Sequence, residues 1–192
     1  MPRFRGMGMG IAAWSARHPY AGKLLAGAAL VLSPVAVWSA PAGAQVPTCL
    51  GLPANIVGTA GHDVLNGTPG NDVIIGLGGD DTINGLGGND TICGDEGNDS
   101  LSGGDGNDVV QGGGGDDIVS GDAGRDSLDG GVGNDAVYGG NEDDDLRGGD
   151  GADQLWGHGG NDGLAGGNGN DFCQGGKGSD ATDGTCERVE AV

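Results

Sequence analysis

From Gly58 to Asp183 the chain reads, in blocks of nine, GTAGHDVLN GTPGNDVII GLGGDDTIN GLGGNDTIC GDEGNDSLS GGDGNDVVQ GGGGDDIVS GDAGRDSLD GGVGNDAVY GGNEDDDLR GGDGADQLW GHGGNDGLA GGNGNDFCQ GGKGSDATD. These 14 units follow one another without an insertion over 126 residues. Position one is glycine and position six is aspartate in every unit. Position four is glycine except at Glu142, and position eight is aliphatic except at Cys173 and Thr182. A register this regular indicates a repeat protein whose units stack on one another.

Each position of the unit has a structural meaning. Glycine supplies positive φ and lets neighbouring backbones pass closely, so positions one to six are expected to form a turn. Asparagine or aspartate at position five tolerates the left-handed region. Positions seven to nine are expected to form a three-residue strand. Only the middle side chain of that strand should point inward, because side chains alternate along a strand.

Two units make one coil of 18 residues, so units of equal parity lie above one another. The predicted fold is all-β: a parallel β-roll, or β-solenoid, of about seven 18-residue coils. One stack of inward side chains is predicted to contain Leu65, Ile83, Leu101, Val119, Val137 and Leu155. The facing stack is predicted to contain Ile74, Ile92, Val110, Leu128, Leu146 and Leu164.

Acidic residues dominate the chain after residue 44. The first 44 residues hold four of the eight basic residues and no aspartate or glutamate. Residues 45–192 hold the other four basic residues and all 28 acidic ones, which leaves this part with a net charge of −24. A chain this acidic repels phosphate backbones and anionic membranes. Nucleic acid is therefore excluded as a partner, and cations are the natural counterions.

The N-terminal segment has the pattern of a secretory signal peptide. Basic residues precede the apolar run LLAGAALVLSPVAVW, which begins at Leu24, and the small residues Ala42, Gly43 and Ala44 follow it. A membrane anchor is the alternative, but Pro34 interrupts a run that is already short of the roughly 20 apolar residues a span needs. We therefore expect residues 1–44 to be a cleaved signal peptide. The mature chain is expected to have no membrane span and to be secreted and extracellular.

The mature chain is predicted to be one domain with covered ends, because a stacked roll must protect its terminal coils. The expected boundaries are an N-terminal cap at residues 45–57, the repeat roll at residues 58–183 and a C-terminal cap at residues 184–192. Four cysteines in an exported chain indicate two disulfides, for which three pairings exist. The pairs Cys49–Cys93 and Cys173–Cys186 are favoured, because each would tie a cap to nearby coils.

The unit resembles the haemolysin-type calcium-binding repeat of RTX proteins, whose consensus is G-G-x-G-x-D-x-U-x with U aliphatic. The resemblance covers the 126 residues of the repeat region. It implies that calcium lies between stacked turns, held by the sixth-position carboxylates and by backbone carbonyls of the turns. The metal ligands implied are Asp63, Asp72, Asp81, Asp90, Asp99, Asp108, Asp117, Asp126, Asp135, Asp144, Asp153, Asp162, Asp171 and Asp180.

Electrostatics favour the same cofactor independently. Carboxylates stacked about 5 Å apart repel by roughly 1 kcal/mol at the dielectric constant of water, and by several at an effective value near 20. Calcium takes six to eight oxygen ligands in flexible geometry, whereas magnesium requires a stricter octahedron. Because little apolar area offsets the chain entropy, a metal-free solenoid is disfavoured and folding is expected to depend on calcium.

Glu142 interrupts the repeat in its tenth unit. A side chain at position four disfavours positive φ, and this one adds a carboxylate beside Asp144. Two columns of seven turns leave at most 12 gaps for calcium. The two gaps that flank the tenth turn are expected to be weak, empty or rebuilt with Glu142 as a ligand.

The sequence does not predict an enzyme. Residues 45–192 contain two histidines, His62 and His158, both in turns, and the motifs H-E-x-x-H and G-x-S-x-G are absent from the chain. The 22 residues outside the repeats are too few for a catalytic domain. The many carboxylates are better explained as metal ligands than as acid–base pairs.

The predicted function is that of a structural or adhesive element outside the cell that depends on calcium. The alternative is a calcium-responsive binding module for a glycan or a cell-surface protein. Tyr138 and Trp156 stand at position nine of units one coil apart and are expected to stack on an outer face. Such a pair serves either as a platform for a sugar or as a stabilising contact of the sheet.

Overall fold

The computed structural model describes residues 46–186 and the backbone of residues 188–190. The predicted signal peptide, residues 1–44, lies outside the described residues. No helix among the described residues has the length and apolar character needed to cross a membrane. Regular structure in this part of the chain consists of β-strands, as the period-two pattern of each unit requires.

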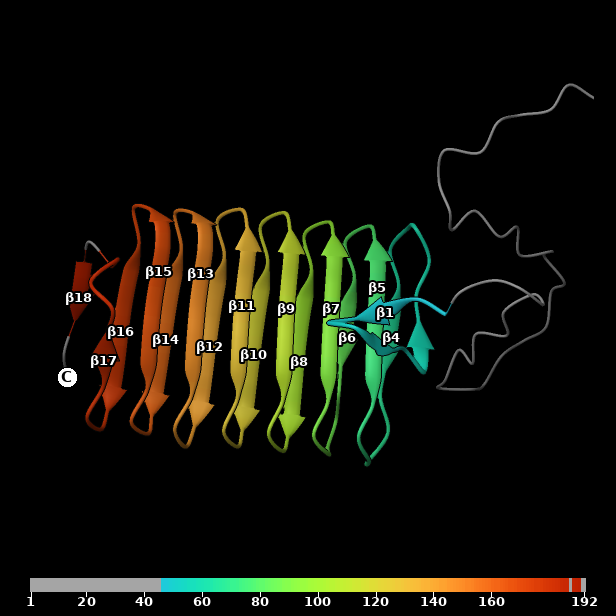
Figure 1. Cartoon of the computed structure of the whole chain (residues 1–192), viewed down its shortest axis with the longest axis horizontal. Helices are drawn as coiled ribbons and strands as arrows, with labels where there is room; N and C mark the ends of the chain where they lie inside the picture. The colour runs from blue at the N-terminus through green and yellow to red at the C-terminus, as the bar shows by residue number, and fades with distance from the viewer. Residues whose placement is uncertain (1–45, 187, 191–192) are drawn as a thin grey trace, which may run out of the picture. The chain divides into compact units, whose positions relative to one another are not determined.

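The strands form two parallel sheets of eight strands each, and consecutive strands alternate between the sheets (Figure 1). One sheet contains, in order, β3 (Ile56–Val57), β5 (Val73–Gly78), β7 (Thr91–Glu96), β9 (Val109–Gly114), β11 (Ser127–Val132), β13 (Asp145–Gly151), β15 (Gly163–Gly169) and β17 (Ala181–Thr182). The other contains β4 (Val64–Asn66), β6 (Thr82–Asn84), β8 (Ser100–Asp105), β10 (Ile118–Ala123), β12 (Ala136–Asn141), β14 (Gln154–Gly159), β16 (Phe172–Lys177) and β18 (Arg188–Glu190). Partners lie 18 residues apart along the repeats, as in the pairing of Val119 with Val137. The predicted β-roll of about seven coils is confirmed.

Most strands are longer than predicted. A typical strand such as β10 continues beyond position nine through positions one to three of the next unit, so that the turn is confined to positions four to six. The ladder has a gap at position one: Ser120 pairs with Tyr138 and Asp122 with Gly140, whereas Gly121 takes no part. The prediction that positions one to six form the turn was therefore wrong. Glycine at position one allows close packing against the aspartate turn.

Aliphatic side chains of position eight form one continuous core between the sheets. All twelve predicted inward residues are buried, and Ile56 and Cys173 extend the stack at its two ends. Each coil therefore contributes two inward side chains, one from each sheet. This apolar core is thin for the length of chain that it orders.

Positive φ is found at position four, as predicted, and also at position two, whereas it was expected as well at position five and is absent there. Glycines at position four, such as Gly106 and Gly133, have φ values of 135° and 141°. At position two, non-glycine residues such as Leu77 and Asp122 also adopt positive φ, with values of 80° and 75°. None of the described position-five residues does so. Their side chains have a different function, which is to link neighbouring coils.

The residues before the first unit add one strand and one hairpin. Ile56 and Val57 form β3, which pairs with β5 and continues the sheet. The hairpin of β1 (Thr48–Cys49) and β2 (Leu52–Pro53) lies against β5 and β7 (Figure 1). There it buries a second apolar cluster on the outside of the roll, made of Cys49, Ala54, Val57, Ile75 and Cys93.

Both disulfides have the expected pairing. Cys49 bonds to Cys93, with Cα atoms 5.7 Å apart, and joins the N-terminal hairpin to β7. Cys173 bonds to Cys186, with Cα atoms 5.9 Å apart, and joins the core of β16 to the segment that follows β17. Each bond ties a segment that flanks the repeats to a strand near one end of the roll.

Two glycines at position four differ both in backbone approach and in φ, which is 141° at Gly133 and not positive at Gly61. A Cβ on Gly133 would clash with the carbonyl oxygen of Gly115 in the coil below, whereas a Cβ on Gly61 would meet nothing within 4 Å. We expect Gly133→Ala to lower the free energy of unfolding by more than about 2 kcal/mol and Gly61→Ala to change it by less than about 0.5 kcal/mol. Denaturant unfolding in saturating calcium measures both, and equal effects would contradict this account of the turn.

Candidate metal centre in the stacked turns

The sixth-position aspartates form two columns, one along each edge of the roll. Each aspartate lies immediately before a strand, and its backbone is held by the coil that follows; for example, the Asp99 carbonyl accepts a hydrogen bond of 2.8 Å from Ile118 N–H. One column contains Asp63, Asp81, Asp99, Asp117, Asp135, Asp153 and Asp171. The other contains Asp72, Asp90, Asp108, Asp126, Asp144, Asp162 and Asp180. The structure thus brings the predicted residues together, one carboxylate per coil in each column.

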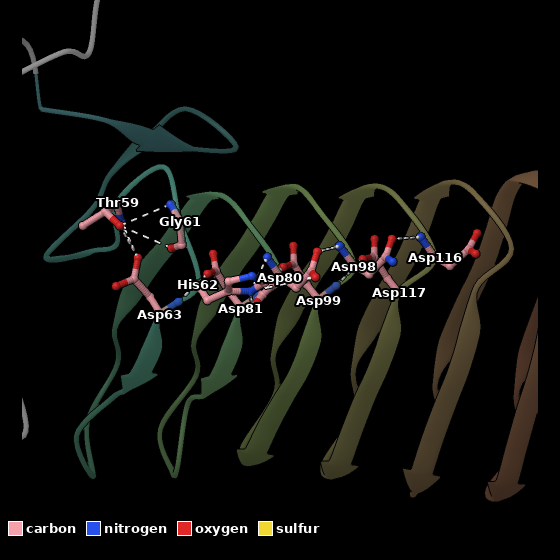
Figure 2. A network of polar contacts seen from close by, with 10 residues as sticks. All are labelled: Thr59, Gly61, His62, Asp63, Asp80, Asp81, Asn98, Asp99, Asp116 and Asp117. Carbon is pink, nitrogen blue, oxygen red and sulfur yellow. Dashed lines mark hydrogen bonds and ion pairs between the residues drawn. The ribbon is translucent and has the colours of Figure 1, made fainter.

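One oxygen of each carboxylate completes a ladder between coils. The Oδ1 atom of Asp99 accepts a hydrogen bond of 2.7 Å from the backbone N–H of Asp81, one coil earlier, and Asp117 does the same for Asp99 at 2.8 Å (Figure 2). The same bond recurs at every step of both columns, with lengths between 2.7 and 3.0 Å. Each aspartate is therefore fixed in rotamer and aimed along the column.

The second oxygen is buried without a hydrogen-bond donor. Twelve of the aspartates, Asp72 to Asp171, are between 1% and 4% exposed. Within the part of the chain that the structure describes, no donor reaches the Oδ2 atoms of Asp81, Asp90, Asp99, Asp108, Asp117, Asp126, Asp135, Asp144, Asp153 and Asp162. A buried acceptor without a partner costs about 1–3 kcal/mol, and more when it is charged, so a repeated row of them calls for a cation.

A second kind of oxygen faces the same spot. A Cβ added to Gly121 would clash with Asp126 Oδ2 and would lie 2.7 Å from the carbonyl oxygen of Gly139 in the next coil. The same two contacts, a carboxylate from the same unit and a glycine carbonyl from the next coil, recur at Gly76, Gly85, Gly94, Gly112, Gly130, Gly139, Gly148 and Gly157. Glycine at position one is required because any side chain would displace these oxygens. Each of these turns therefore places a carboxylate oxygen and a glycine carbonyl oxygen against the same glycine, and the carboxylate oxygen has no hydrogen-bond donor in the described structure.

The turns suit a hard cation that accepts main-chain ligands. No group of three or more histidine, cysteine, aspartate or glutamate side chains converges among the described residues. A metal in these turns would therefore draw on glycine carbonyls as well as on one carboxylate per coil. Carboxylate and carbonyl oxygens are the ligands that calcium prefers. The donor set therefore fits calcium and lacks the nitrogen and sulfur ligands that zinc usually takes.

Burial raises the pKa of the stacked carboxyls. Desolvation is the largest cause, hydrogen bonds from backbone N–H groups oppose it, and the charges of neighbouring aspartates add to it. The pKa rises to about 6 for Asp81 and Asp135 and to about 7 for Asp117 and Asp144. Without a cation, these groups take up protons close to neutral pH, which is the expected response of a carboxylate column that lacks its counterion.

The first two turns differ from the others. Thr59 donates hydrogen bonds to Asp63 Oδ2 from its backbone N–H at 2.6 Å and from its hydroxyl at 2.8 Å. Thr68 does the same for Asp72 at 2.6 and 2.9 Å. Threonine occupies position two in these two units alone. It donates to the oxygen that has no donor in units three to twelve, so threonine at position two was the sequence signal for this difference.

Glu142 adopts positive φ and does not break the tenth turn. Its φ is 71°, lower than the values above 100° of the position-four glycines from Gly79 onward. Its Oε2 atom accepts a hydrogen bond of 3.1 Å from Gly124 N–H in the coil below. Its charge helps to raise the pKa values of Asp126 and Asp144, so the extra carboxylate lies near one aspartate column.

Position five carries a second, outer ladder. The Asn71 side-chain oxygen accepts a hydrogen bond of 2.8 Å from Asn89 N–H. In the other column, the same bond links Asp80 to Asn98 at 3.0 Å and Asn98 to Asp116 at 2.8 Å (Figure 2). This ladder explains the abundance of asparagine and aspartate at position five. These residues are common there because their side-chain oxygens accept hydrogen bonds from the next coil, and not because they tolerate positive φ.

The pKa shifts predict how the metal-free roll responds to pH. Folded values near 6 to 7 lie above the ordinary value of 3.8, so the folded state binds protons more tightly than the unfolded chain. The stability gained by protonation is full below the unfolded value and is lost as the pH rises through 6 to 7. After calcium is stripped by a chelator, far-UV circular dichroism should show more β-structure and a higher Tm at pH 5 than at pH 8. Equal β-structure and Tm at the two pH values would contradict the burial of these carboxyls.

Comparison with protein families agrees with the geometry. The model of the RTX calcium-binding nonapeptide repeat matches residues 57–92, 93–128, 111–146, 129–164, 138–173 and 147–181. A comparison with curated proteins gives no match. The matched segments cover nearly the whole roll and include all fourteen aspartates. Repeat period, parallel coils and aspartate turns all agree with that family, and the chain belongs to the RTX calcium-binding nonapeptide repeat family.

Proposed function

We propose that this chain is a secreted protein that folds around calcium and serves outside the cell as a structural or adhesive element. The row of buried Oδ2 atoms beside glycine carbonyls is the observation that carries the proposal. No protein group in the described turns neutralises these oxygens. A bound calcium ion would neutralise them and join one coil to the next.

The proposed calcium ligands are the sixth-position carboxylates together with glycine carbonyls of the turns. The carboxylates are those of Asp63, Asp72, Asp81, Asp90, Asp99, Asp108, Asp117, Asp126, Asp135, Asp144, Asp153, Asp162, Asp171 and Asp180. The end members should contribute least. Thr59 and Thr68 already occupy the oxygens of Asp63 and Asp72, and Asp180 is exposed in the last turn.

Two features support a role outside the cell. The chain begins with the pattern of a signal peptide, and its four described cysteines are joined in two disulfides, which persist in oxidising compartments. Extracellular calcium modules typically have dissociation constants of about 10⁻⁴ to 10⁻³ M. A roll that requires calcium at this level would fold after export, where calcium is abundant.

A binding module for a glycan or a cell-surface protein is the second candidate function. It is favoured by an aromatic stack on the outside of the roll, where Tyr138 and Trp156 lie with ring centroids 4.6 Å apart. An outer aromatic pair beside a pocket can recognise a partner. The aspartate columns by themselves give no reason for such a pair. Both functions require the calcium-bound fold, so they differ in whether this surface is used.

Calcium-coupled folding is the direct test of the proposal. The mature chain in excess chelator at pH 7.5 should be mostly disordered by far-UV circular dichroism, and millimolar calcium should restore the β signal cooperatively. Magnesium at the same concentration should be much less effective, because its octahedron is stricter. A full β signal in chelator at this pH would overturn the proposal.

Two aspartates provide a matched pair for the same titration. Asp117→Asn removes a carboxylate whose Oδ2 has no donor in the described structure, whereas Asp63→Asn removes one that Thr59 already satisfies. We expect the first variant to raise the calcium midpoint by at least about threefold and the second to change it little.

Glu142→Gly tests the altered turn. Relief of the side chain at positive φ should raise the free energy of unfolding in calcium by roughly 1 kcal/mol. Glu142→Gln is the control: it retains the backbone cost and removes the charge near Asp126 and Asp144, so it should recover only the electrostatic part. Thermal unfolding and a count of bound calcium measure both variants. If Glu142→Gly lowers both quantities, Glu142 is a working ligand.

A further inference from the structure

An aromatic ladder lies on the outer face of the sheet that contains β12, β14 and β16, which are neighbours in the roll (Figure 1). Tyr138 pairs in register with Trp156, and their rings are almost parallel, with an interplanar angle of 3°. His158 stacks near Tyr138 with ring centroids 6.1 Å apart, and Phe172 meets Trp156 edge-on at 6.2 Å. Position nine earlier in this sheet holds only asparagine and serine, so the aromatic ladder is a local feature.

The ladder ends at a pocket one coil further on. The next residue in register with Trp156 is Gln174, which breaks the aromatic sequence. A pocket of about 210 Å³ lies here, lined by Trp156, His158, Gln174, Gly176 and Lys177. These residues come from β14 and β16, and Tyr138 is not among them. The pocket therefore lies on the side of the indole that faces the C-terminal coils, opposite the side that Tyr138 covers.

The volume of this Trp156 pocket suits one six-membered ring. The coil spacing places the aromatic rings of Tyr138 and Trp156 at a stacking distance of 4.6 Å, and a ring bound over Gln174 would continue the same stack. Pockets for drug-sized ligands start at roughly 300 Å³, so this smaller space fits a single ring of a longer molecule that extends into solvent.

The rim of the pocket indicates which ring it takes. Gln174 offers an amide, His158 an imidazole and Lys177 an ammonium group, all of which form hydrogen bonds with hydroxyl groups. The net charge of −24 after residue 44 repels anions, which disfavours nucleotides and strongly acidic ligands. We propose that the Trp156 pocket binds a neutral hexose unit of a glycan, with the apolar face of the sugar against the indole and its hydroxyls against the polar rim.

This proposal rests on the second candidate function and names its site and ligand class. The calcium-folded state is established first by circular dichroism, so a failure to fold is distinguished from a failure to bind. Trp156 is the only tryptophan in residues 45–192, so its fluorescence reports on the pocket. The probes are a printed array of neutral and acidic oligosaccharides in millimolar calcium, followed by fluorescence titration with the neutral oligosaccharides that bind.

Two variants alter the pocket in opposite ways. Trp156→Ala removes the stacking surface, and Gln174→Tyr keeps the indole but fills the space with the next ring of the ladder. Each should weaken binding of the neutral oligosaccharide by roughly tenfold or more, a factor that corresponds to about 1.4 kcal/mol. Trp156→Phe should retain binding within about threefold, because a smaller aromatic face remains. Gln111→Ala is the control, since it changes a position-nine side chain on the opposite sheet and should leave the affinity unchanged.

Other outcomes would overturn the proposal. If the folded protein binds no glycan on the array, or if Gln174→Tyr binds as well as the unaltered chain, the pocket is not a sugar site. Binding confined to acidic glycans would assign recognition to Lys177 and not to the indole face. Fluorescence quenching by an aromatic peptide, without a response to any glycan, would assign the pocket to a protein partner.

Discussion

The structure depends on the stacking of like charges along the two edges of the roll. One aspartate per coil lies in each column, and nearly all are buried. From Asp81 onward, each Oδ1 accepts a hydrogen bond from the backbone N–H of the aspartate one coil earlier, which fixes the side chain along the column. The other oxygen faces a glycine carbonyl with no donor nearby in the described structure. Such a column is unfavourable by itself, because both desolvation and repulsion disfavour the ionised state. A calcium ion between coils, as proposed, would neutralise these oxygens and join one coil to the next.

The remaining interactions are modest and repeat with the same period. Each coil buries two aliphatic side chains of position eight, and a thin core of this kind offsets little of the entropy lost by so many glycines. Two side-chain ladders, at positions five and six, add hydrogen bonds that run along the roll and not around it. The ends are fixed by different means, since Cys49–Cys93 and Cys173–Cys186 hold the flanking segments. Each coil is thus stabilised mainly by its neighbouring coils, as expected for a solenoid.

Units that depart from the repeat consensus give single turns or outer faces of the roll a different chemistry. Threonine at position two donates hydrogen bonds to the Oδ2 atoms of Asp63 and Asp72, whereas Oδ2 has no such donor in units three to twelve. Glu142 adds a further carboxylate to the tenth turn, where its side chain accepts a hydrogen bond from Gly124 N–H. Tyr138 and Trp156 place aromatic surface on one outer face, and Gln174 leaves a pocket beside it. Because every coil has the same geometry, the unit number of a substituted residue fixes its place along the roll, and its position within the unit fixes the face on which it lies.

The sequence by itself determined the period, the number of coils, the inward residues and the fourteen aspartates, because each of these follows from a strict nine-residue register. It also favoured the correct disulfides, since each cysteine pair lies near one end of the roll. Only the tertiary structure decided the function of each glycine and of position five. Whether Gly121 is needed for positive φ or for the oxygens of Asp126 and Gly139 depends on a residue 18 positions away. The same is true of the Asn71 ladder and of the pocket beside Trp156, since both are built between coils and no single unit contains them.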